Sequence, residues 1–104
     1  MAWTYLFLAG ICEVGWAIGL KYSNGLSRPV AAAFTIVLML VSAGLLGLAL
    51  RTLPVGTAYA VWTGIGTVGT AVLGLYLFSE PATAVRLLGI GLVLAGVVTL
   101  KIIG

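Results

Sequence analysis

Residues 30–50 read VAAAFTIVLMLVSAGLLGLAL, a run of apolar residues that contains no charged side chain. A helix needs roughly 20 predominantly apolar residues to cross the hydrocarbon core of a bilayer. The run is too long for a membrane strand, and its polar and apolar positions do not alternate. It therefore predicts a membrane-spanning helix, and it indicates that the chain is an integral membrane protein.

Three comparable runs flank this segment, at residues 2–20, 55–78 and 85–103. Short clusters of charged and turn-forming residues separate the runs, for example KYSNG at 21–25 and RTLP at 51–54. We expect no cleaved signal peptide, because the run 2–20 lacks a basic flank and carries a Glu in its interior. The sequence thus predicts an all-α integral membrane protein, with residues 1–104 forming a single domain of four transmembrane helices.

The composition agrees with a lipid environment: 62% of the residues are hydrophobic, 7% are charged, and the mean hydropathy is +1.29. Soluble domains are roughly 25% charged. The chain has no His and no Asp, and its acids are Glu13 and Glu80. This inventory disfavours a zinc site, a Ser-His-Asp triad and paired carboxylates within one subunit. We expect no enzyme activity, no metal, no cofactor and no nucleic-acid partner.

Glu13 is the residue that most clearly points to function. It lies about eleven residues into the first span, or roughly 17 Å deep at 1.5 Å per residue. A charge at that depth costs about 2.5–3.5 kcal/mol on insertion scales, and every Lys and Arg lies at or near the end of a predicted helix. An unpaired carboxylate there either takes up a proton or holds a cation that arrives and leaves. The alternative is a Glu that is hydrogen-bonded between helices as part of their packing. Glu80, by contrast, is expected to be a solvated loop acid.

Several neighbours support handling of an ion by Glu13. Gly10, Glu13 and Trp16 share one helix face, because they are spaced i, i+3 and i+6. Gly10 would leave space beside the carboxylate, and Trp16 offers an indole N–H and a π face. Three further candidates lie in the second and third spans: Ser42, Tyr59 and Trp62. For the aromatic residues the alternative is an interfacial belt, which suits Trp3 and Tyr5 better than Trp62.

Glycines suggest a bend and a packing surface. Gly64 and Gly66 predict a hinge in the third span, because glycines weaken a helix and often absorb conformational change; close helix packing is the alternative. The fourth span has no ionisable residue in its middle and carries a small-xxx-small pattern, which allows two helices to approach closely. We therefore assign its small residues to dimer packing: Gly89, Gly91, Ala95 and Gly96.

A single chain would make a poor cavity, since it has four helices and one buried carboxylate. A homodimer would bring two Glu13 side chains to one pocket. One end of the predicted bundle carries Arg51 and Lys101, and the other carries Lys21, Arg28 and Arg86. With charges this nearly equal, the positive-inside rule favours neither orientation of the chain in the membrane. We expect insertion in both orientations, and therefore an antiparallel, dual-topology homodimer.

The sequence also resembles a known family, the small multidrug resistance proteins. The resemblance lies in GICEVGW at 10–16, KYSNG at 21–25, LPVGTAYAVWTGIG at 53–66, and Glu80-Pro81. Trp16, followed by Lys-Tyr-Ser, is similar to the guanidinium exporter subtype, whereas the multidrug subtype usually has a small residue at this position. Leu26 departs from the Phe that is usual in the family.

The resemblance implies an antiparallel dimer that exchanges protons for a cation, with Glu13 of both subunits as the shared site. It implies that Trp16, Ser42 and Trp62 form hydrogen bonds around these carboxylates, and that Tyr59 rearranges as access switches. The expected function is proton-coupled export of guanidinium, and of small substituted guanidinium ions, across the bacterial inner membrane. The alternative is a broad exporter of quaternary ammonium and aromatic cations. A non-transporting subunit and a channel are less consistent with a buried Glu among aromatic residues.

Overall fold

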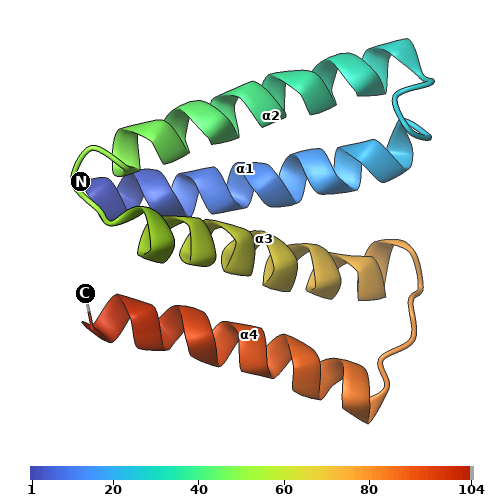
Figure 1. Cartoon of the computed structure of the whole chain (residues 1–104). Helices are drawn as coiled ribbons and strands as arrows, with labels where there is room; N and C mark the ends of the chain where they lie inside the picture. The colour runs from blue at the N-terminus through green and yellow to red at the C-terminus, as the bar shows by residue number, and fades with distance from the viewer. Residues whose placement is uncertain (104) are drawn as a thin grey trace.

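The computed structural model describes residues 1–103, and this part of the chain forms four α-helices (Figure 1). They are α1 (Ala2–Tyr22), α2 (Pro29–Ala49), α3 (Val55–Leu77) and α4 (Ala84–Ile103). All four are long and apolar enough to cross a membrane. The prediction of an all-α chain with four helices able to span a membrane is confirmed, and every observed helix end lies within two residues of the predicted one.

The helix ends follow from local chemistry. Pro29 begins α2, where its missing N–H would have had no partner in any case. After α1, Asn24, Gly25 and Leu26 have φ angles of 52°, 69° and 72°, and such left-handed residues end a helix. The Ser23 hydroxyl donates to the carbonyl of Leu20 over 3.1 Å and accepts the Leu26 N–H over 3.0 Å, which stabilises this turn.

The helices lie side by side in a single layer, in the order α2, α1, α3, α4 (Figure 1). The Cα atoms span 39 × 34 × 16 Å, so the shortest dimension of the layer is less than half of either of the others. The core is correspondingly small and is centred on Leu6, Ala49, Ala58 and Val61. A layer of this kind leaves both of its broad faces exposed, so lipid or a second subunit must cover them.

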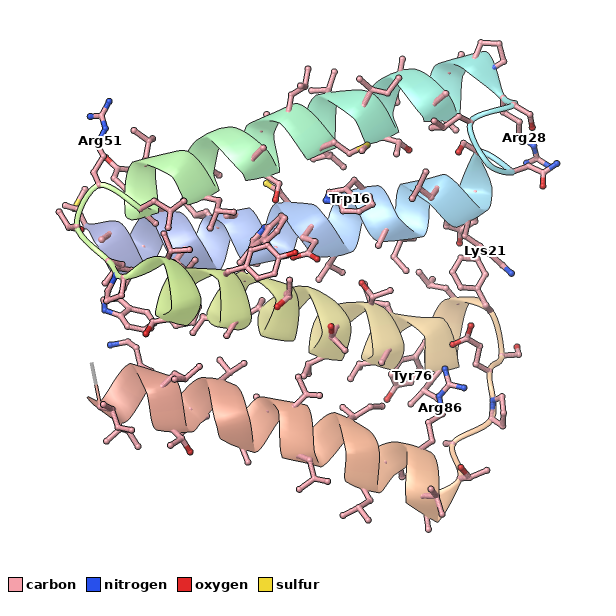
Figure 2. The ribbon with its side chains drawn as sticks, in the orientation of Figure 1. Trp16, Lys21, Arg28, Arg51, Tyr76 and Arg86 are labelled. Carbon is pink, nitrogen blue, oxygen red and sulfur yellow. The ribbon has the colours of Figure 1, made fainter. Side chains whose placement is uncertain are left out.

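The two ends of the layer carry different charges. Figure 2 places Arg51 at the end where α1 begins, and Lys21, Arg28 and Arg86 at the opposite end. Lys101 belongs to the first end, because its Nζ lies 4.7 Å from the centroid of the Trp3 ring. Each end therefore carries the charged residues assigned to it from the sequence. The direction of insertion remains a prediction.

Candidate functional site

Glu13 lies midway along α1 and packs against α3. Its carboxylate touches the backbone of Gly66 so closely that a Cβ at that position would overlap it. The Oε2 atom is buried and has no hydrogen-bond partner within residues 1–103. A buried polar atom without a partner is unfavourable, and a charged one more so. The site is therefore complete only when a proton, a cation or a group from outside this chain reaches the carboxylate.

Glycines set the close approach of α1 to α3. The space beside Gly10 is filled by Ile65, whose Cγ2 would lie 2.6 Å from a Cβ at position 10. The expectation that Gly10 leaves room beside the carboxylate is therefore wrong, because this glycine admits a side chain of α3. Gly66 makes the room for Glu13 instead. Gly10 and Glu13 both contact α3, whereas Trp16 lies on the side of α2 (Figure 2), so the three residues do not share one face as their spacing predicted.

Ser42 and Trp62 form a hydrogen-bonded chain that ends on the backbone of α1. The Trp62 Nε1–H donates to the Ser42 hydroxyl over 2.9 Å, and that hydroxyl donates to the main-chain carbonyl of Ala9 over 2.7 Å. Ser42 is fully buried. In an α-helix the Ala9 carbonyl is also the acceptor for the N–H of Glu13. These two hydrogen bonds thus connect α3 and α2 to the turn of α1 that carries Glu13.

Trp16 and Tyr59 lie around the site without bonding to its carboxylate. Trp16 projects from α1 on the side of α2 (Figure 2), and it donates no hydrogen bond to Glu13 Oε2 within the described chain. Tyr59 is 56% exposed, and its ring packs edge-on against Trp62 with centroids 5.5 Å apart. The expected hydrogen bonds from Trp16 and Trp62 to Glu13 are thus not formed within one subunit, since Trp62 is bonded to Ser42.

Gly64 and Gly66, the predicted hinge, face different neighbours. A Cβ at Gly64 would overlap Val97 of α4, and one at Gly66 would overlap Glu13. Gly64 therefore permits close approach of α4 to α3, and Gly66 permits close approach of α1. Helix α3 runs through both glycines without interruption from Val55 to Leu77. Bending at this pair remains a prediction.

A groove of about 460 Å³ runs from Glu13 between α1 and α3 towards the linker that precedes α4. Thr67 and Thr70 line its middle, and Lys21, Glu80 and Arg86 line its far end. Glu80 lies in the linker and water reaches it, as expected of a loop acid, but the sequence did not predict its ion pair with Arg86, in which Oε1 lies 2.6 Å from Arg86 Nη2. Sequence reasoning also missed the two threonines, although Thr70 is four residues from both Gly66 and Gly74, a spacing that places all three on one side of α3.

The small residues of α4 point away from the rest of the chain. Gly89, Gly91, Ala95 and Gly96 are exposed, and a Cβ at any of the three glycines would meet no atom within 4 Å. These residues are therefore available to a second subunit, as the packing prediction requires. The dimer itself remains a proposal.

The fold and the site define a multi-pass membrane protein with one unpartnered carboxylate in the middle of a spanning helix. Residues 1–93 match the family model described as Small Multidrug Resistance protein. The chain belongs to the small multidrug resistance family, as its motifs predicted.

Several similar proteins share one name. The chain is 56% identical to the "Guanidinium exporter" of Yersinia pseudotuberculosis over 102 residues, covering 98% of both chains. It is 54% identical to the "Guanidinium exporter" of Citrobacter freundii, covering 98% of this chain and 97% of that one. The "Guanidinium exporter" of Salmonella typhimurium strain LT2 is 52% identical, again covering 98% of this chain and 97% of that one.

Proposed function

We propose that this protein is a proton-coupled antiporter that exports guanidinium across the bacterial inner membrane. The observation that carries the proposal is the buried, unpartnered Oε2 of Glu13 in a helix able to span the bilayer. A carboxylate in that position requires a positive partner, and a proton and a cation compete for it because each neutralises the same charge. Relatives with more than half of their residues identical carry the name guanidinium exporter.

Coupling follows from this competition. When a proton occupies Glu13 the cation is excluded, and when the cation binds the proton must leave. If the site opens to only one side at a time, net movement of one ion drives the other in the opposite direction. No separate coupling device is needed, so a chain of 104 residues with short loops is sufficient.

Guanidinium suits the site chemically. It is planar and carries N–H donors, so a carboxylate can accept two of them side by side with favourable geometry as well as charge. A quaternary ammonium ion has no N–H and gains charge attraction and cation–π contact, the latter about 0.5–2 kcal/mol.

The functional unit in this proposal is an antiparallel, dual-topology homodimer. The groove that begins at Glu13 is open to the outside of the subunit, and a second copy laid across the groove would close it. Two Glu13 carboxylates would then share the site and titrate as a coupled pair. The exposed small residues of α4 and the nearly equal charges at the two ends support this arrangement.

The test is transport by the purified protein in proteoliposomes, with guanidinium and tetramethylammonium compared under the same proton gradient. Unpaired polar groups cost roughly 1–3 kcal/mol each, so guanidinium should be carried at least about tenfold better. Better transport of tetramethylammonium, or of a large aromatic cation, would favour the multidrug alternative. The proposal would fail if none of these cations exchanged for protons.

A further inference from the structure

A second carboxylate, Glu80, lies at the far end of the groove that begins at Glu13. Glu13 packs against Gly66 and Glu80 packs against Gly74, so α3 provides a bare backbone position for each acid. The two glycines are separated by roughly 12 Å along the helix, at 1.5 Å per residue. The acids are therefore too far apart to share one small cation, but they line one continuous space.

Glu80 is held in the groove by three contacts. Its Oε1 pairs with Arg86 Nη2 over 2.6 Å, its N–H donates to the Gly74 carbonyl over 3.3 Å, and its carboxylate lies against the Gly74 backbone. The pair with Arg86 joins a guanidinium group to a carboxylate. This is the same chemical interaction that a guanidinium substrate would make with an acid.

The charges around Glu80 show what a cation would meet at this end of the groove. Lys21 and Arg86 line the groove beside Glu80, and Lys21 Nζ lies 5.6 Å from the centroid of the Phe78 ring. Two cations and one acid give this end a net positive charge, which disfavours entry of another cation. Glu80 is the carboxylate that offsets this repulsion, and its access to an ion depends on Arg86.

We propose that Glu80 is a peripheral binding site for guanidinium-type cations, in which the arriving cation displaces the side chain of Arg86. The two paired side chains are 36% and 37% exposed, so water reaches both. Partly exposed ion pairs add little to stability, and at the carboxylate an arriving guanidinium ion would reproduce the hydrogen-bond geometry of the Arg86 side chain that it replaces. This inference rests on the proposed function and extends it by assigning an entry and exit step to the groove.

The first test compares KM for guanidinium in Glu80→Gln and Arg86→Gln at low ionic strength. Glu80→Gln removes the peripheral acceptor and should raise KM about 3–10-fold, because charge at the mouth of a cleft sets the local ion concentration. Arg86→Gln removes a competitor and a repelling charge, and should lower KM. Both effects should shrink in high salt, because the Debye length falls from about 10 Å at 0.1 M to about 3 Å at 1 M.

Opposite signs are the diagnostic result, because an ion pair with only a structural role would impair transport in both variants. The matched control is Arg28→Gln, which removes one positive charge from the same end of the layer (Figure 2) but from a residue outside the groove. Its KM should remain unchanged. If Glu80→Gln does not fold, Arg86→Gln decides: a lowered KM supports the inference, and an unchanged or raised KM overturns it.

Direct binding gives a second, independent measurement. In a Glu13→Gln background the central site is lost, so weak guanidinium binding should remain, and Glu80→Gln added to this background should abolish it. Equal binding by the single and double variants would overturn the inference. Failure of the proposed function is distinguishable, because the unmodified protein would then not exchange guanidinium for protons at all.

Discussion

The carboxylate of Glu13 lies against the bare backbone of Gly66, and a Cβ at position 66 would overlap it. This contact joins α1 to α3 at the proposed exchange site. It makes Gly66 a residue that determines where the carboxylate sits, although Gly66 has no side chain of its own.

Substitution of Gly66 should therefore impair guanidinium binding. The added methyl group in Gly66→Ala would displace the Glu13 carboxylate, and overpacking of this kind costs about 1–3 kcal/mol. We expect guanidinium affinity to fall about tenfold or more, as measured by titration of the purified protein. The control is Gly44→Ala, since position 44 is exposed and a Cβ there meets no atom within 4 Å. Equal affinity in the two variants would show that the Gly66 contact is unimportant.

The Trp62–Ser42–Ala9 chain should contribute to stability. Ser42→Ala leaves the Trp62 N–H without its acceptor, and a lost partner of this kind costs roughly 1–3 kcal/mol. The apparent unfolding temperature in detergent should fall. Thr99→Ala should have little effect, because Thr99 is exposed and its hydroxyl bonds to Ala95 of its own helix. If both variants were equally stable, the hydrogen-bonded chain would not be a stabilising link.

Topology follows from the charges at the two ends of the layer. A reporter fused to the C-terminus should be found on both sides of the membrane, because Arg51 and Lys101 nearly balance Lys21, Arg28 and Arg86. Two Lys residues added at one end should strongly favour one orientation. A single orientation of the unmodified protein would contradict the dual-topology dimer.

Guanidinium binding should depend on pH with a defined sign. Protons and guanidinium compete for Glu13, so the apparent Kd for guanidinium should rise as the pH falls. Where one proton is displaced for each cation bound, the limiting slope is about tenfold per pH unit. Calorimetry in buffers of different ionisation enthalpy would count the released protons directly. A Kd independent of pH would exclude competition at one site.

The number of helices and the depth of Glu13 could be predicted from the sequence, because both depend on hydrophobic length. The lateral order α2, α1, α3, α4 could not. In lipid, apolar helices have no hydrophobic preference for one neighbour over another. The partners of Gly10 and Gly66 follow from that order, so they too were inaccessible.

The same reason explains the remaining differences at the site. Ser42 and Trp62 were predicted as site residues, but their mutual hydrogen bond depends on how α2 and α3 meet over α1. The pairing of Glu80 with Arg86 spans a linker with no helical period, so spacing gave no signal for it.

The most direct test of the central claim is proton flux driven by a guanidinium gradient in sealed proteoliposomes, measured for the unmodified protein and for Glu13→Gln. Glu13→Gln is nearly isosteric and cannot bind a proton and a cation in alternation. The account predicts a pH change across the membrane with the unmodified protein and none with Glu13→Gln, while circular dichroism confirms that the variant remains helical. Guanidinium-driven proton movement that persists in Glu13→Gln would contradict it.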